Sequence, residues 1–232
     1  MISIQYILKQ YKDNVVVNIP SLEIEKGQSF GLVGNNGAGK TTLFRMLLDL
    51  VKPSGGHIYS NGADVSQGET WKSYTGSYLD EGFLIGYLRP DEYFAFVGKL
   101  HGLNKAEISA RLQQYEELFN GEILGHKKYI RDLSKGNQKK VGIVAAMLPN
   151  PEVLVLDEPF ANLDPTTQIR LKKLLREFKE EHGTTLLISS HDLNHVTEVC
   201  ERIVVMQKGE LVKDIVTEEA TLKELEEYFA LS

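Results

Sequence analysis

The residues with the clearest chemical meaning form a glycine-rich loop near the start of the chain. Residues 34–42 read GNNGAGKTT and fit the pattern G-x-x-x-x-G-K-[ST], which is typical of loops that hold phosphate groups. Glycines let the backbone curl so that its N–H groups turn inward, and a following helix adds its positive end. In this pattern Lys40 reaches the β- and γ-phosphates, and the Thr41 hydroxyl ligates Mg²⁺. The predicted nucleotide-binding residues of the loop are Gly34, Asn35, Asn36, Gly37, Ala38, Gly39, Lys40, Thr41 and Thr42.

A second group of candidate residues is a pair of carboxylates at the end of an apolar run. Residues 153–159 read VLVLDEP, so Asp157 and Glu158 follow directly after the apolar residues. In a parallel sheet, ligands gather outside the carboxyl ends of the strands, where the phosphate loop also lies. We therefore expect Asp157 to hold Mg²⁺ through water beside Thr41, and Glu158 to polarise an attacking water. The alternative is a strand-end Asp that only caps the next turn.

The surrounding segments predict how these residues are positioned. Residues 29–33 are a short apolar strand and residues 42–50 a helix, which is the context that a phosphate loop requires. Residues 153–156 and 184–188 have the composition of buried parallel strands, with a crossover helix at 165–181 between them. Strands alternating with helices predict an α/β fold with a mainly parallel sheet. Further strands are expected at 3–9, 15–24, 57–60, 203–206 and 210–212, and further helices at 90–102, 104–120, 134–148 and 222–229.

The chain is expected to be one domain spanning residues 1–232, with two additions to the parallel sheet. The strands near the N-terminus predict an antiparallel β subdomain, and the helices between about residues 89 and 148 predict a helical insertion lobe. A chain of 232 residues that is 42% hydrophobic can bury a substantial core. Its net charge of −6 argues against a nucleic-acid partner, because such surfaces are usually basic.

The sequence also predicts the cellular setting. No apolar run approaches the length of a membrane span, and the start of the chain lacks the pattern of a secretory signal. The single cysteine, Cys200, cannot form an internal disulfide, which indicates a reduced, cytoplasmic setting. Its apolar neighbours predict a packed side chain and not a nucleophile.

A further motif precedes the acidic pair: residues 133–138 read LSKGNQ. Ser134 and Gly136 are expected at a helix N-terminus, which would form a second anion site. The alternative is an ordinary capped helix with a basic face at Lys139 and Lys140. Together with the phosphate loop and LVLDEP, in this order, the motif resembles the signature of the nucleotide-binding domain of ATP-binding-cassette (ABC) transporters. The resemblance covers nearly the whole chain.

This resemblance implies roles for residues outside the main motifs. His191, after the strand at 184–188, is similar to the family's switch histidine and would contact the γ-phosphate. Leu163 and Asp164 lie in a stretch, ANLD, that resembles the D-loop. Tyr11 lies where the family places an aromatic ring that stacks on adenine; the alternative is a half-buried tyrosine at a strand end.

The resemblance also implies the reaction and the partners. The ligands would be ATP and Mg²⁺, with Glu158, His191 and Lys40 as the catalytic residues. Two ATPase domains, a homodimer in the simplest case, would pack head to tail, and a separate multi-span permease would hold them at the cytoplasmic face of the membrane. The short chain and its D-loop look similar to exporter subunits of the ABC-2 type. The signature residues that would act on the partner's ATP are Ser134, Lys135, Gly136, Asn137 and Gln138.

Three positions depart from the family pattern. Glu81 stands where the family usually has a glutamine that senses the metal, and we expect it to act on a Mg²⁺-bound water as an acceptor only. Lys135 replaces a glycine of the signature, and Asn137 replaces a glutamine. Lys135 either faces solvent, which we favour, or adds a cation near the partner's phosphates.

The insertion lobe is rich in apolar side chains that would mark a docking groove if they are exposed together. The alternative is an ordinary helical core. These residues are Phe83, Leu84, Tyr87, Leu88, Tyr93, Phe94 and Phe96. Two other classes of protein remain open: a soluble ATP-dependent assembly or regulatory protein on the same cassette, and a phosphate-loop kinase or GTPase.

Overall fold

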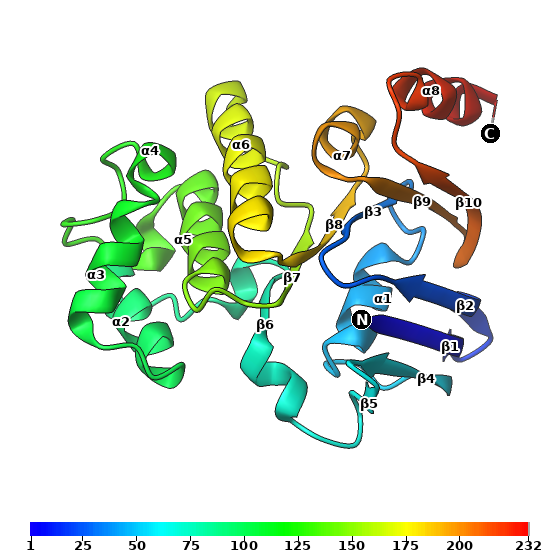
Figure 1. The fold of residues 1–232 in the computed structure, drawn as a ribbon, viewed down its shortest axis with the longest axis horizontal. Coiled ribbons are helices and arrows are strands. Elements are labelled where there is room, and N and C mark those ends of the chain that lie inside the picture. Colours follow the sequence, from blue (N-terminus) through cyan, green and yellow to red (C-terminus); the bar gives the residue numbers. More distant parts are fainter. Residues whose placement is uncertain (232) are drawn as a thin grey trace.

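A computed structural model describes residues 1–231, and its elements spread along one long axis (Figure 1). Helices α2 to α4 lie at one end and the strands β1, β2 and β4 lie toward the other, and a larger sheet extends from between them, at β6, β7 and β8, to the end that holds β1 and β2. The strands are β1 Ile2–Tyr11, β2 Asn14–Ile24, β3 Ser29–Val33, β4 Gly55–Ser60, β5 Ala63–Asp64, β6 Thr75–Tyr78, β7 Val153–Asp157, β8 Thr185–Ser190, β9 Arg202–Gln207 and β10 Glu210–Val216. The α-helices are α1 Lys40–Leu47, α2 Pro90–Leu100, α3 Lys105–Gln113, α4 Glu116–Phe119, α5 Lys135–Met147, α6 Pro165–His182, α7 Leu193–Val199 and α8 Thr221–Leu231.

The larger sheet has six strands in the order β10-β9-β3-β8-β7-β6. All neighbours pair in parallel except β9 and β10, which form an antiparallel hairpin at one edge. Every residue of β3 and β7 is buried, as their apolar sequences predict for strands covered on both faces. The prediction of a mainly parallel sheet is confirmed.

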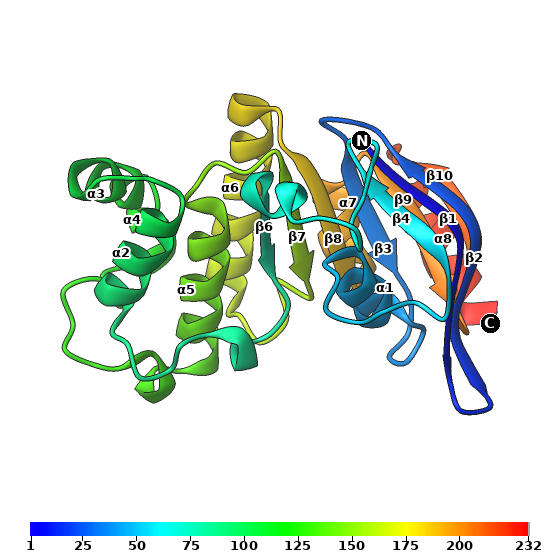
Figure 2. The ribbon, with the colours of Figure 1, turned by 90° about the horizontal axis from the view of Figure 1, so that it is seen from below.

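Each face of this sheet packs into a separate core. Leu154 and Leu156 of β7 pack into the core that contains the buried faces of α5, α6 and α7. Val153 and Val155 point the opposite way, into a core with α1 and the four-stranded sheet β2-β1-β4-β5. Figure 2 shows α1 on the side of β3 that faces this antiparallel sheet, so the predicted antiparallel subdomain is also present.

The helical lobe differs from the sequence prediction in one place. The single helix expected over residues 104–120 is wrong: α3 ends at Gln113, and a separate short helix, α4, starts at Glu116. Tyr115 lies between them with non-helical dihedral angles and is almost fully buried. Anchoring this large ring in the lobe core turns the chain out of the helical path.

One helix was not predicted as an element. Helix α7 follows β8 after a short loop, and the Asp192 side chain caps it by accepting a hydrogen bond from the Asn194 N–H. Its seven residues are too few for a clear apolar periodicity. No helix within residues 1–231 combines the length and apolar character that crossing a bilayer requires.

Two glycines bring β6 unusually close to α5. A Cβ at Gly76 of β6 would lie 2.1 Å from the Ala146 carbonyl oxygen, and a Cβ at Gly142 of α5 would lie 2.3 Å from the Tyr78 ring. Only hydrogen fits at these positions, so the end of β6, and the Glu81 segment after it, packs directly against α5.

Candidate active site

The phosphate loop connects β3 to α1 and follows the predicted strand–loop–helix arrangement. Gly39, the N-cap of α1, has φ of 111°, which an L side chain rarely adopts. At Gly34 a Cβ would lie 2.2 Å from the Met206 carbonyl oxygen of β9, so a glycine is required there for packing. The sheet and the loop therefore constrain each other.

A cavity of about 200 Å³ lies over this loop. The Lys40 side chain is buried, and its Nζ donates to the Gly34 carbonyl oxygen at 2.6 Å. Glu158 reaches the same cavity, with its Oε1 3.5 Å from Lys40 Nζ. The lining residues are Val16, Asn36, Gly37, Ala38, Gly39, Lys40, Thr41, Thr42 and Glu158.

Asp157 and the phosphate loop meet across β8, as expected for strand ends at the same edge of a parallel sheet. The Thr41 hydroxyl donates to Asp157 Oδ2 at 2.5 Å. Ser189, at the end of β8, donates its hydroxyl to the other oxygen of the same carboxylate. Burial raises the pKa of Asp157, although the hydrogen bonds from Ser189 and Thr41 oppose that rise.

The Glu158 carboxylate lies between two side chains that the sequence had linked to the γ-phosphate. His191 Nδ1 is 2.8 Å from Glu158 Oε2, and Lys40 is on the side of Oε1. His191 itself is half exposed at the surface after β8. The structure thus brings Lys40, Thr41, Asp157, Glu158 and His191 together in one site.

The signature and the D-loop line a second cavity, of about 340 Å³. Ser134 is the N-cap of α5, as predicted, and its hydroxyl accepts a hydrogen bond from the Asn137 N–H at 3.2 Å. Gln138 points away and donates to the Leu133 carbonyl oxygen at 2.9 Å. The lining residues are Glu122, Ser134, Lys135, Gly136, Asn137, Lys140, Asn162, Leu163 and Asp164. None of these lines the cavity over the phosphate loop, so the described chain carries two separate cavities at its motifs.

The Glu81 carboxylate is held on the side of β6 and α5. It accepts a hydrogen bond from the Tyr78 hydroxyl at 2.8 Å, and the Lys135 ammonium lies 4.0 Å from its other oxygen. Burial and the Glu81 charge raise the pKa of Tyr78, so the phenol stays protonated and donates. Lys135 is mostly exposed, which agrees with the solvent-facing alternative. Two of the departures from the family pattern therefore lie next to each other.

The structure contradicts the alternative of a basic face on α5. Lys139 and Lys140 are both buried. Lys139 Nζ donates to backbone carbonyl oxygens beside Glu158, and Lys140 Nζ contacts Glu122 at 3.3 Å. Both lysines are buried next to oxygen acceptors from other segments, carbonyl oxygens for Lys139 and the Glu122 carboxylate for Lys140, which spacing along the sequence does not reveal.

Two residues near the phosphate loop were missed or lie elsewhere. Val16 of β2 lines the cavity, although its sequence marks it only as a strand residue. Tyr11 is half exposed and is not among the described residues that line the cavity over the phosphate loop. The Lys9 ammonium lies 4.7 Å from the centre of its ring. Its stacking on adenine stays a prediction.

Comparison with known proteins identifies the family. Residues 17–161 match the family model described as ABC transporter. The chain is 37% identical over 212 residues to an uncharacterized ABC transporter ATP-binding protein, YhaQ, of Bacillus subtilis, covering 91% of this chain and 70% of that protein. It is 34% identical over 221 residues to the bacitracin transport ATP-binding protein BcrA of Enterococcus faecalis, covering 93% and 69%. The chain belongs to the ATP-binding proteins of the ABC transporter family.

Solved structures show the same fold. An ATP-binding subunit of an ABC transporter matches with a TM-score of 0.84 and 26% identity, covering 100% of this chain and 94% of that one. CbiO1 from Clostridium perfringens, part of the ABC transporter complex cbiONQ, matches with a TM-score of 0.79 and 27% identity, covering 99% and 94%. The expected ABC ATPase fold, with its antiparallel subdomain and helical lobe, is therefore confirmed.

Proposed function

We propose that this chain binds and hydrolyses ATP at the site around Lys40 and Glu158, and that hydrolysis powers transport through a separate membrane subunit. The observation that carries the proposal is the position of the Glu158 carboxylate, between Lys40 and His191 at the cavity over the phosphate loop. A carboxylate there can orient a water for in-line attack on the γ-phosphate. Lys40 and His191 then lie where charge develops on the leaving group and on the transferred phosphoryl oxygens.

The residues present fit Mg²⁺ beside the phosphates. Mg²⁺ prefers oxygen ligands and keeps several of its waters. The Thr41 hydroxyl and the Asp157 carboxylate converge within 2.5 Å, which supplies one direct oxygen ligand and one acceptor for bound water. When bound, the ion would neutralise charge on the β- and γ-phosphates. That Glu81 belongs to this set is a proposal. In the structure its carboxylate contacts Tyr78 and Lys135.

The two separate cavities support a dimer. Within the described residues, the signature cavity shares no lining residue with the phosphate-loop cavity of the same chain. A second copy, packed head to tail, would place its Ser134 and Gly136 against the ATP held by Lys40. The phosphates of the bound ATP would then be covered from two sides, and hydrolysis would release the two copies.

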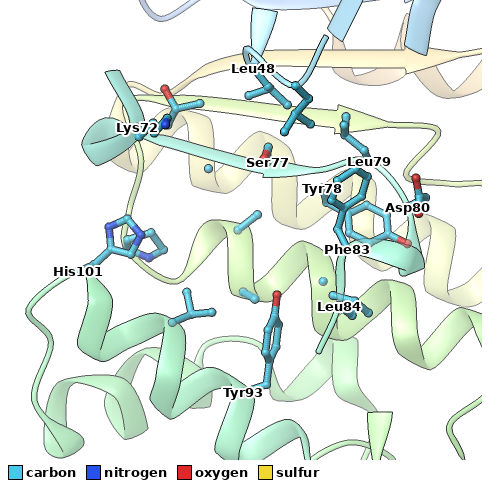
Figure 3. A pocket seen from close by; sticks show the side chains of 18 of the residues that line it. Leu48, Lys72, Ser77, Tyr78, Leu79, Asp80, Phe83, Leu84, Tyr93 and His101 are labelled. Carbon is cyan, nitrogen blue, oxygen red and sulfur yellow. The ribbon is translucent and has the colours of Figure 1, made fainter. Parts of the chain in front are cut away.

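A third cavity supports docking of a membrane subunit. It has a volume of about 360 Å³ and lies between the end of α1, the β6 segment and helices α2 and α5, as Figure 3 shows. Phe83 is exposed at this groove, whereas Leu84 and Tyr93 are half buried in it and Phe94 is core. Of the apolar lobe residues, Phe83, Leu84 and Tyr93 line this groove. Tyr87 and Phe96 are exposed but do not line it, and Phe94 belongs to the helical core.

This groove would accept an apolar segment of the permease at the cytoplasmic face of the membrane. Asp80 lines the groove one residue before Glu81, so an occupant would press on the segment that holds Glu81.

The exporter subtype stays a prediction, because relatives of similar identity include both the bacitracin transport protein and a methionine import protein. The latter, MetN of Carboxydothermus hydrogenoformans, is 33% identical over 199 residues, covering 84% of this chain and 59% of that protein.

The Glu158→Gln variant tests the proposal most directly. The amide keeps the size of the side chain but cannot polarise the water, so ATP should stay bound and the ATPase rate should fall by about 10²-fold or more. Light scattering at saturating MgATP should then show a dimer. A chain that stays monomeric under these conditions would count against the head-to-tail scheme. Co-purification of the parent chain with a multi-span membrane protein separates transport from the soluble alternative.

A further inference from the structure

A buried ammonium holds the turn that carries Glu158. Lys139 lies on α5, five residues after the N-cap Ser134, and only 4% of the residue is exposed. Its Nζ donates to the Glu158 carbonyl oxygen at 2.7 Å and to the Ala161 carbonyl oxygen at 2.8 Å. The helix that begins with the signature is thus bonded directly to the backbone of the catalytic carboxylate.

The backbone at Glu158 needs such support. Glu158 has φ of 48°, in the left-handed region that side chains other than glycine rarely occupy. Such conformations persist only where the surroundings determine them fully, and they cluster at active sites. The Glu158 N–H donates to the Ser189 hydroxyl at 3.0 Å, so Ser189 fixes one side of the residue and Lys139 the other.

A second helix holds two further carbonyl groups of the same turn. Gln168 of α6 donates its side-chain amide to the Phe160 carbonyl oxygen at 3.1 Å and to the Leu163 carbonyl oxygen at 3.2 Å. The turn from Glu158 to Leu163 is therefore fixed from α5 by a cation and from α6 by a neutral amide. Of these two side chains, only Lys139 lies on the helix that starts at the signature.

The charge on Lys139 also suits its surroundings. The carboxylates of Glu81, Glu158 and Asp157 are its charged neighbours and oppose the effect of burial, which lowers the pKa of Lys139. Its Nζ also lies 6.0 Å from the centre of the Tyr78 ring. One ammonium group thus faces the Glu81 segment, the acidic pair and the D-loop turn together.

We infer that Lys139 is a positioning residue for ATP hydrolysis, which sets the Glu158 carboxylate in its attacking geometry and makes that geometry follow the signature helix. This inference rests on the proposed ATPase function. Lys139 does not line the phosphate-loop cavity within the described residues, so it acts through Glu158 and not by binding the nucleotide. As a consequence, α5 would contact the ATP held by the partner copy through its N-terminus, and it would position Glu158 against the ATP held by its own chain.

The test is steady-state ATPase kinetics of the isolated chain with Lys139→Met and Lys139→Gln. Methionine keeps the volume but removes all donors, and glutamine keeps a shorter, neutral donor. Because small misplacements of a catalytic group are costly, Lys139→Met should lower kcat by about 30- to 100-fold. The KM for MgATP, and the Kd of a fluorescent ATP analogue, should stay within about twofold of the parent values, because the contacts that bind the nucleotide are unchanged. Lys139→Gln should recover part of the lost kcat.

Lys172→Met is the matched control. Lys172 is also buried, but its Nζ contacts only Glu198 of α7 among the described side chains, at 2.7 Å. It should keep the parent kcat. A Lys139→Met enzyme with the parent kcat, or one whose KM rises as kcat falls, overturns the inference. If Lys139→Met does not fold, Lys139→Gln decides: a kcat below that of the parent with an unchanged KM supports the inference, and the parent kcat overturns it. A parent chain without any ATPase activity would instead refute the proposed function.

Discussion

At the scale of single residues, the site combines positions that the sequence predicts with positions that only the fold reveals. Lys40 and Thr41 were predicted from the spacing of the phosphate-loop pattern. Asp157 and Glu158 were predicted from their place at the end of an apolar run, whose carboxyl end should meet that loop. Ser189 was not, since a serine at the end of a buried strand carries no signal until its neighbour, Asp157, is known.

Glu81 provides a prediction at this scale. Glu81→Gln keeps an oxygen that accepts the Tyr78 hydroxyl, whereas Glu81→Ala leaves that buried phenol without its partner. Side chains that orient a metal site typically contribute 10- to 100-fold, so Glu81→Ala should lower the ATPase rate by about tenfold or more and Glu81→Gln by less. Steady-state rates at saturating MgATP measure this. Rates equal to the parent in both variants would remove Glu81 from the site.

At the scale of elements, the structure explains which segments were predictable. Helix α5 was predicted to within one residue at each end, because Ser134 is a good N-cap and Pro149 follows its end. The strand β7 was predicted because it is wholly apolar. Helix α7 and the break after α3 were not, because a short helix and a single buried ring leave no periodic pattern. The burial of Lys139 depends on what packs against α5, which lies far away in the sequence.

The close packing of β6 on α5 can be tested by adding one methyl group. In Gly142→Ala the new Cβ would lie 2.3 Å from the Tyr78 ring, so the ring and the strand must shift. Overpacking of this kind usually lowers the free energy of unfolding by about 1–3 kcal/mol. Urea denaturation measures the change, and Gly68→Ala is the control, because a Cβ there meets no atom within 4 Å. Equal midpoints for the two variants would show that β6 and α5 are not tightly packed.

At the scale of the whole molecule, carboxylates at helix starts and in ion pairs stabilise the fold at neutral pH. Hydrogen bonds from the Thr167 hydroxyl and N–H lower the pKa of Asp164, which caps α6. Burial raises the pKa of Glu201, but hydrogen bonds from Lys179 and Ser29 outweigh it and leave that pKa lowered. Such groups bind fewer protons in the folded chain than in the unfolded chain.

The chain should therefore lose stability in acid. A lowered folded pKa contributes stability above the unfolded value and loses it as pH falls through the folded value, so the urea midpoint should drop below about pH 5. Fluorescence-detected urea titrations at several pH values between neutral and acid measure it. In Asp164→Asn the dependence should be weaker, because the amide does not titrate. An unchanged midpoint down to pH 3 would contradict a stabilising role for the carboxylates whose pKa is lowered in the folded chain.

The separation of the two cavities has a genetic consequence. A chain with Lys40→Ala lacks a working phosphate loop but keeps its signature, and a chain with Ser134→Arg keeps its loop but blocks its signature cavity. Neither should hydrolyse ATP alone. When the two defective chains are mixed, each mixed pair should contain one intact composite site, formed by the loop of one copy and the signature of the other, so activity should return. Two inactive alleles would then complement each other in one cell, which a site confined to a single polypeptide would not allow.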